Sequence, residues 1–348
     1  GGTEGRGGGG GEERDIGWRG EGGVGDGVIL NDNTPTARVS GSGAVWVVPI
    51  LAWYHMSFDT EPDIEHTKVH PPNMVMSDFK LCKWPAGLDP LDDSVAAALD
   101  RVNDERQGWG DFLAALEGGT REERGAHLIT FSHFLPRLEL CPEKRMLFYP
   151  NLPKAVGSDY ILRRIQGLAT FGRANAELVA ESNLGSTSTP GGGWSRREHV
   201  HVFGHTHFGW DHTLDGIRYI QAPVSYPNEW KQRPGSLTVG PDTRGAEFNL
   251  SREAPQMLDA PLCIWDAKRD EVVDVEESGE GGKEVVAGPE RAVAGLKSCG
   301  GGGGGHGEFG FVGEMRARWS DHYKENPRDP DNTEFAWWVK GAMRGAKA

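Results

Sequence analysis

Two histidines separated by a single residue, His205 and His207, lie in the segment VFGHTHFGWD, directly after an apolar run. In extended backbone, residues i and i+2 project to the same side, and Gly204 permits a turn that brings both imidazoles close to a ligand. Neutral imidazole is a common ligand for Zn, Fe and Mn. Two ordinary histidines of a surface loop are the alternative, but the glycine turn after a strand favours a metal site.

A third imidazole, His133, closes the apolar run LITFS and precedes Phe-Leu-Pro-Arg. Taken alone it would be a structural histidine. Its place at the end of a strand, upstream of the histidine pair, favours a third metal ligand. Arg137 follows in the same block and would either bind a phosphate oxyanion or form a structural ion pair.

Other polar residues near these blocks have weaker indications. His201 lies within a strand and is expected to be structural, whereas His55 in WYHMSFD either packs in the core or lines a pocket. Asp211 would accept the second N–H of a ligand histidine or form a turn. Arg218 is open to the same two interpretations as Arg137. The sequence shows no Ser-His-Asp signature and no phosphate-binding P-loop.

Apolar runs of strand length alternate with helical patterns along the chain. Strands are expected within 44–59 and at 127–134, 199–203, 217–224 and 261–267. Helices are expected at 92–107, at a second short stretch that includes Phe112 and Leu116, and at 158–168. Pro49 in the first strand indicates an edge position or a bulge. The interleaving predicts an α/β fold in which the histidines follow strand ends, where ligand sites of layered α/β proteins are built.

Glycine-rich sequence divides the 348 residues, of which 51 are glycine. Such segments bury little apolar surface and are expected to be disordered or flexible. The expected organisation is a disordered Gly-rich segment at 1–40, a domain at 41–275 with flexible inserts at about 177–198 and 232–259, an acidic Gly-rich linker at 276–310, and an aromatic-rich tail at 311–348.

The formal net charge is −14. With no dense Lys/Arg patch, this charge disfavours nucleic-acid binding. No apolar run approaches the ~18 residues of a membrane span, so no membrane partner is expected. The four cysteines are widely spaced without a CxxC pair, which favours free thiols in a reducing, intracellular compartment over a disulfide framework. Nothing in the sequence indicates an oligomeric state.

Three blocks together resemble a known family: WYHMSFD (53–59), TFSHFLPR (130–137) and GHTHFGWD (204–211). The chain resembles the C-terminal portion of the calcineurin-like metallophosphoesterase superfamily, in a branch of plants, algae and protists. The resemblance implies a four-layer α/β sandwich, two packed β-sheets flanked by helices, that hydrolyses a phosphorylated small molecule or phosphoprotein. It also implies Mn, Fe or Zn ions held by His133, His205 and His207.

The family's DxH, GDxx and GNH[DE] motifs, expected upstream of WYHMSFD, are absent. A two-metal site needs hard oxygen ligands such as a bridging carboxylate, which three neutral histidines do not supply. We therefore expect a partial gene product that is inactive as written, with no catalytic residue of its own and with hydrolysis belonging to the complete protein.

The alternative is a non-catalytic binding or scaffold protein derived from the same fold. Its aromatic tail would dock on a partner, although packing of the tail onto its own domain is the favoured interpretation. The tail side chains concerned are Trp319, Tyr323, Trp337 and Trp338.

Overall fold

The structure is a computed structural model. It describes residues 37–39, 45–66, 69–119, 126–182, 198–240, 262, 264–266 and 310–344. Nearly all of the segment predicted to be disordered (1–40), the predicted linker (276–310), most of the first predicted insert and the later part of the second lie outside the described residues.

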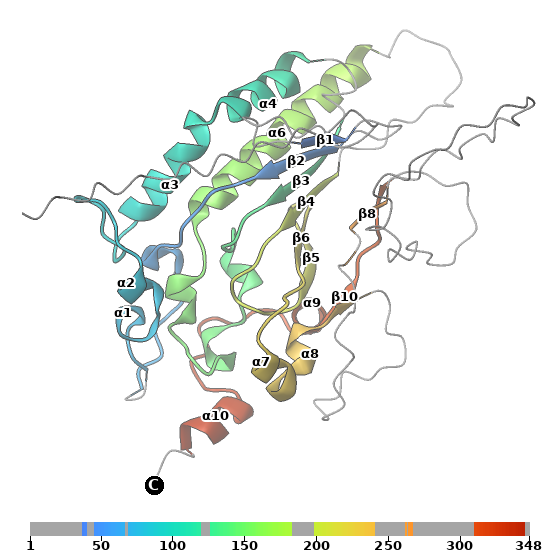
Figure 1. The fold of residues 1–348 in the computed structure, drawn as a ribbon. Helices are drawn as coiled ribbons and strands as arrows, with labels where there is room; N and C mark the ends of the chain where they lie inside the picture. The colour runs from blue at the N-terminus through green and yellow to red at the C-terminus, as the bar shows by residue number, and fades with distance from the viewer. Residues whose placement is uncertain are drawn as a thin grey trace, which may run out of the picture.

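A six-stranded sheet in the order β1-β2-β3-β4-β6-β5 forms the centre of the molecule (Figure 1). The four inner strands pair in parallel, and the two outer strands pair antiparallel to their neighbours. Their bounds are β1 Ala37–Val39, β2 Val45–Pro49, β3 His127–Phe131, β4 His199–Val202, β5 Trp210–Leu214 and β6 Ile217–Gln221.

Most residues of the inner strands are buried because both faces of the sheet are covered, although β4 carries two polar side chains. In β4, His199, Val200 and His201 are all buried. The sequence-based expectation for Pro49 was wrong in one respect, since β2 lies inside the sheet. Pro49 is the last residue of that strand, and the next residue, Ile50, donates the hydrogen bond to Phe131 that continues the ladder (2.8 Å).

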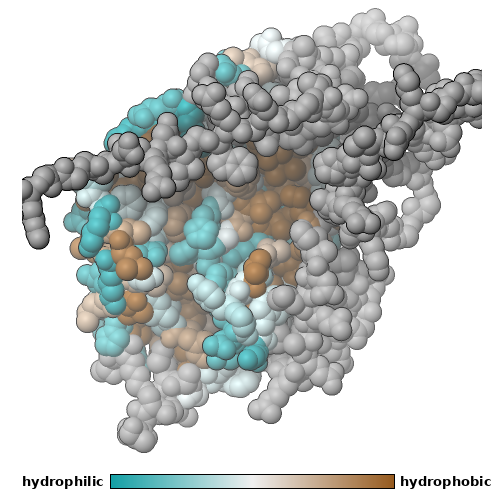
Figure 2. Space-filling view, in the orientation of Figure 1, coloured by the Kyte–Doolittle hydropathy of each residue, from teal (hydrophilic) through white to brown (hydrophobic). Residues whose placement is uncertain are grey.

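Three long helices cover one face of the sheet (Figure 1): α3 Ser94–Glu105, α4 Gln107–Gly118 and α6 Asp159–Ser182. Apolar side chains spaced along these helices pack on the strands; Phe112 and Leu116 of α4 join Trp46 and Leu128 in one buried cluster. Helix α6 continues well past the predicted end at residue 168, into the first predicted insert. Figure 2 shows apolar surface over the strands and polar side chains near the lower end of this view.

The opposite face carries a short two-stranded ribbon of β7 Val239–Gly240 and β10 Arg316–Ala317, followed by α9 Arg318–Glu325. Val239 and Ala317 bury against Val200 and Ile220 of the central sheet. The second predicted insert (232–259) therefore has ordered structure at its start, including α8 Pro234–Leu237. A parallel-dominated sheet between helices and a second β-layer confirms the predicted α/β fold class.

The aromatic tail packs onto the chain's own domain. Tyr323 stacks on Trp210 of β5 with ring centroids 5.9 Å apart, and Trp338 of α10 (Trp337–Arg344) donates to the carbonyl of Met146 at 3.2 Å. Arg328 donates to the Cys141 carbonyl and pairs with Glu61, which lies 267 residues earlier. Of the four tail aromatics named above, Trp337 is largely exposed (72 %).

Short helices and turns connect these layers. They are η1 Met56–Phe58, α1 Pro72–Val75, α2 Asp78–Leu81, η2 Leu138–Leu140, η3 Lys144–Met146, η4 Leu152–Ala155 and α7 Pro227–Gln232, and a further ribbon pairs β8 Trp265–Asp266 with β9 Gly310–Phe311. None of the helices in the described ranges has both the length and the apolar character that a membrane crossing requires.

Candidate functional site

The carboxyl ends of parallel strands meet at one edge of the sheet, which is where open α/β sheets bind ligands. The chain leaves β3 into His133 and leaves β4 into His205 and His207. The two loops are tied directly together, because the Gly204 amide donates to the His133 carbonyl at 3.0 Å. A Cβ atom at Gly204 would lie 3.4 Å from that carbonyl oxygen, tighter than most such contacts.

His133 and His205 face each other across this edge. Nδ1 of His205 lies 3.2 Å from Nε2 of His133, with ring centroids 5.1 Å apart and the planes at 81°. Burial lowers the pKa of both of these histidines, and His207 lies near enough that its charge adds to the lowering. The structure thus places all three predicted imidazoles at one strand edge, two of them in contact.

Both histidines of the GHTH turn have left-handed backbone, with φ of 74° at His205 and 54° at His207. This region is uncommon for residues other than glycine, although histidine, asparagine and aspartate adopt it more often than most, and such conformations gather at functional sites. Ser225, in the facing loop after β6, also has a positive φ, of 60°. Of the four non-glycine residues with positive φ in the described part of the chain, three therefore lie in these two loops, and the fourth, Asp215, lies in the turn between β5 and β6.

One ring nitrogen of His205 and one of His207 each have a defined partner. Nε2 of His205 lies 2.9 Å from the Ala155 carbonyl oxygen, and Nδ1 of His207 lies 2.8 Å from Oε2 of Glu229. A carbonyl or carboxylate fixes the proton on the nitrogen that faces it, which leaves the opposite nitrogen with a free lone pair. Metal-binding histidines are usually oriented in this way.

Charge in the facing loop is fixed by hydrogen bonds. Burial acts to raise the pKa of Glu229, but hydrogen bonds from Ser225 and Arg233 outweigh burial and hold that pKa at about 2. Glu229 is therefore an anion that accepts from His207. Burial, with the nearby charge of His133, lowers the pKa of His205 to about 4, and burial also lowers the pKa of His133. The facing imidazoles are neutral near pH 7.

The histidine pair fits part of a metal coordination sphere. Two nitrogens bound to one Zn²⁺ at 2.0–2.1 Å in tetrahedral geometry lie about 3.3 Å apart, close to the separation of His133 and His205. However, no group of three or more His, Cys, Asp or Glu side chains within the described ranges is arranged to hold a metal ion. Those residues fit two ligands of one ion and do not fit the two-ion centre that the resemblance implies.

Arg137, the predicted phosphate-binding residue, is engaged by two carboxylates. Its guanidinium lies 2.5 Å from Asp215 and 2.8 Å from Glu139. These contacts correspond to the structural alternative considered for Arg137, although the side chain also lines a pocket.

The predicted role of Asp211 beside a ligand histidine was wrong, as was its alternative as a turn residue. Asp211 lies in β5 and is fully buried. Its carboxylate accepts hydrogen bonds from the Arg218 guanidinium at 2.6 and 2.7 Å and from the backbone amide of Met315. Arg218 has the structural role, since the same guanidinium also donates to the carbonyl of Gly313.

His201 is structural, as predicted, and belongs to a buried chain of hydrogen bonds. Thr130 Oγ1 lies 2.8 Å from His199 Nε2 and 2.9 Å from His201 Nδ1, and His201 Nε2 lies 3.1 Å from Ser132 Oγ. Ser132 donates onward to the Phe134 carbonyl at 2.7 Å. This series of hydrogen bonds ends at Ser132 and Phe134, the two neighbours of His133, and so supports the loop that carries His133.

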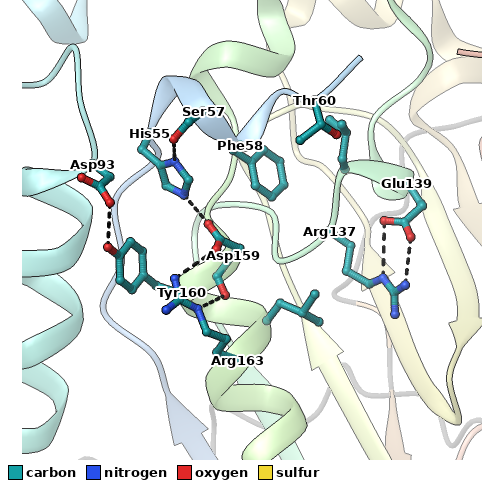
Figure 3. Close-up of a pocket in the computed structure, with 12 residues that line it drawn as sticks. His55, Ser57, Phe58, Thr60, Asp93, Arg137, Glu139, Asp159, Tyr160 and Arg163 are labelled. Carbon is teal, nitrogen blue, oxygen red and sulfur yellow. Dashed lines mark hydrogen bonds and ion pairs between the residues drawn. The ribbon is translucent and has the colours of Figure 1, made fainter. Parts of the chain in front are cut away.

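A pocket of about 360 Å³ lies beside α6, with His55 in its wall (Figure 3). His55 was expected either to pack in the core or to line a pocket. It does both, because it is only 4 % exposed and also belongs to the pocket lining. Its Nδ1 lies 2.8 Å from Ser57 Oγ and its Nε2 lies 2.6 Å from Asp159 Oδ1. Sequence reasoning found no Ser-His-Asp signature because Asp159 is about a hundred residues away; the spacing of His55 and Ser57 was the only local signal.

Comparison with known proteins adds little. No family model matches the chain, and no curated protein matches it. Among solved structures, the phosphopantetheinyl hydrolase from Mycobacterium tuberculosis is similar at 20 % identity and a TM-score of 0.32, over 57 % of this chain. The match spans 56 % of that hydrolase, little more than half its length. A likeness at this level does not identify a shared function.

Proposed function

We propose that this chain carries the histidine side of a phosphoesterase-type metal site, with His133 and His205 as ligands of one divalent transition-metal ion. The observation that carries the proposal is the 3.2 Å approach of Nδ1 of His205 to Nε2 of His133, with the other ring nitrogen of His205 held by a carbonyl. The resemblance of the WYHMSFD, TFSHFLPR and GHTHFGWD blocks supplies the reaction class, phosphoester hydrolysis.

His207 is the third proposed ligand. Glu229 holds its Nδ1, so Nε2 is the nitrogen available for a metal. The three imidazoles are not arranged to bind one ion together within the described residues. His207 would therefore have to move toward His133 and His205 when an ion binds. Substitution of His207 should therefore weaken binding less than substitution of His133 or His205.

Hydrolysis by these residues alone is not expected. Bound metal would polarise a phosphoryl oxygen and activate water, but the two-ion form of that chemistry needs bridging oxygen ligands. Among described residues, Asp78 is the carboxylate whose charge acts on His133, partly offsetting the lowering of its pKa by burial. The proposed substrate class, a phosphorylated small molecule or phosphoprotein, therefore belongs to a form in which further oxygen ligands reach the site.

Cobalt binding tests the metal site without relying on activity. Co²⁺ should give visible absorption bands typical of nitrogen ligation with the wild-type chain, and His133→Ala or His205→Ala should abolish them. His70→Ala, an exposed histidine, is the matched control and should leave the bands unchanged. Equal spectra for wild type and both site variants would end the proposal.

Turnover of p-nitrophenyl phosphate with Mn²⁺, Fe²⁺ or Zn²⁺ tests the second part. We expect no rate above that of the metal ions alone. Robust, chelator-sensitive turnover lost in His205→Ala would show that the chain's own residues suffice for hydrolysis, and would overturn the expectation of inactivity while supporting the metal site.

The alternative function, a non-catalytic binding protein, relied on the tail as a docking element. Trp319, Tyr323 and Trp338 are instead engaged within the chain, through contacts to Ser236, Trp210 and Met146. This packing removes most of the surface that the alternative required, and we therefore favour the metal-site proposal.

A further inference from the structure

We propose that Ser57 is an activated nucleophile, with His55 as its base and Asp159 as the carboxylate that orients the base, and that it takes the acyl group of a small carboxylic ester bound in the pocket. This site is separate from the histidine pair and does not depend on a metal. It gives a chemical role to the HMS portion of the WYHMSFD block, which the proposed metal site does not use.

The three side chains form a continuous series along the pocket wall (Figure 3). Ser57 Oγ lies 2.8 Å from His55 Nδ1, and Asp159 Oδ1 lies 2.6 Å from His55 Nε2. The Ser57–His55 contact has the geometry of a hydrogen bond between a nucleophile and its base, and Asp159 lies within reach of the other ring nitrogen as the orienting group. Relative to the familiar triad the ring is reversed, with Nδ1 toward the hydroxyl, and either nitrogen of a neutral imidazole accepts a proton when the other carries the hydrogen.

The proton positions follow from the partners. A carboxylate only accepts, so the His55 proton is on Nε2 and the Nδ1 lone pair accepts the Ser57 hydroxyl. Oδ1 of Asp159 lies close to Nε2 of His55 but off the direction of the N–H bond. Poorly aligned contacts of this kind in ligand-free sites often become well aligned when substrate binds. Burial acts to raise the pKa of Asp159, but its contact with His55, a hydrogen bond from its own backbone amide and the charge of Arg163 outweigh burial and keep that pKa below its ordinary value.

The backbone holds this series in place. The His55 amide donates to the Gly157 carbonyl at 3.2 Å, which joins the turn at η1 to the start of α6. Phe58 packs so tightly on Gly157 that a Cβ there would lie 2.4 Å from its ring. Arg163 holds the second oxygen of Asp159 at 3.0 Å. The base and the orienting carboxylate are therefore positioned before any ligand arrives, as nucleophilic catalysis requires.

The pocket itself indicates the ligand class. Ser57 is exposed in the pocket lining. Phe58, Leu138 and Leu162 supply the apolar part of the wall, and polar and charged side chains such as Arg137 supply the rest. A volume of about 360 Å³ lies at the small end of ligand sites, which suits a short acyl chain rather than a polymer. The acyl part would contact the apolar wall, with the ester carbon beside Ser57.

The reaction balances without a cofactor. Ser57 Oγ bonds to the ester carbon as its proton passes to His55 Nδ1. The bond from that carbon to the alcohol oxygen then breaks, and His55 returns the proton to the departing alcohol. Water attacks the acyl-serine with His55 as base, so that a carboxylic acid leaves and the Ser57 hydroxyl is restored.

A fluorophosphonate probe tests the nucleophile directly, because it forms a stable adduct with activated serines. The full chain should gain one adduct, located on Ser57 by peptide mass spectrometry and absent in Ser57→Ala. His55→Gln and Asp159→Asn should slow labelling by about 100-fold or more, in line with the usual contribution of a base. Ser77→Ala removes another exposed serine and should label like wild type.

Ester turnover gives the second readout. p-Nitrophenyl butyrate should be hydrolysed by wild type and by Ser77→Ala alike, and a chelator should not change the rate, which separates this site from the metal site. If Ser57 is not labelled, or if folded His55→Gln labels as fast as wild type, the three residues only clamp the turn to α6 and the proposal is wrong.

Discussion

The carbonyl oxygen of Ala155 lies 2.9 Å from Nε2 of His205, and this contact determines which nitrogen of the ring is protonated. The proton stays on Nε2, and Nδ1 is left to face His133. The carbonyl belongs to η4, which also leads into the start of α6, so one short segment orients both His205 and, through Asp159, His55.

Stability should fall as the pH drops from about 6.5 toward 4. The folded pKa of His205 is about 4, below its ordinary value of 6.5, so the unfolded chain binds protons that the folded chain does not. A tenfold change in proton affinity corresponds to about 1.36 kcal/mol of stability, and partial exposure of His205 limits its share to about 1–3 kcal/mol.

Urea unfolding at pH 7 and pH 5 measures this loss. His205→Gln should show a smaller difference between the two pH values than wild type, because it removes a group that titrates in this window. His70→Gln, at an exposed position, should behave like wild type. Carboxylates with lowered pKa values, such as Glu229, lose their contribution at lower pH and do not obscure the comparison.

Thr130→Val should destabilise the fold by about 2–4 kcal/mol, because it removes the hydroxyl shared by His199 and His201 and leaves two buried groups short of a hydrogen bond. Thr170→Val is the matched control on the exposed side of α6 and should change stability by less than about 0.5 kcal/mol. Thermal unfolding compares the two. Equal midpoints would show that the buried chain of hydrogen bonds contributes nothing.

Arg218→Met should cost about 3–5 kcal/mol, since it leaves the fully buried carboxylate of Asp211 without its cation. Arg163→Met also breaks an ion pair, but both partners there are more than half exposed, and the loss should stay below about 1 kcal/mol. Chemical denaturation measures the difference. The double variant Arg218→Met with Asp211→Leu should recover part of the loss, because it removes the stranded charge.

Gly157→Ala should be strongly destabilising, by about 1–3 kcal/mol or more, because the added Cβ would lie 2.4 Å from Phe58 and 2.5 Å from the Leu135 carbonyl oxygen. Gly167→Ala, in the middle of α6 with nothing within 4 Å, should instead stabilise by about 0.5–1 kcal/mol. Opposite signs in the unfolding free energy are expected. Losses of the same size would show that the crowding at Gly157 relaxes easily.

The inner strands and the meeting of His133 with His205 could be predicted from the sequence, because apolar runs and a glycine turn are local signals. Strand β5 was missed because WDHTL is not an apolar run, and the charge of its Asp211 is compensated by Arg218 of the neighbouring strand β6. The contact of His55 with Asp159 was missed because the two residues lie far apart in the sequence. Pairs distant in sequence become visible only once the sheet brings them together.

The contact between Arg328 and Glu61 has a consequence for how the chain folds during synthesis. Glu61 lies just after the WYHMSFD block, yet its guanidinium partner emerges from the ribosome 267 residues later. Contacts that close such long loops form slowly, and domains generally fold from the N-terminal side as they are made. Glu61 therefore acquires this contact only once Arg328 has left the ribosome, so a nascent chain arrested between the two residues would lack the ion pair.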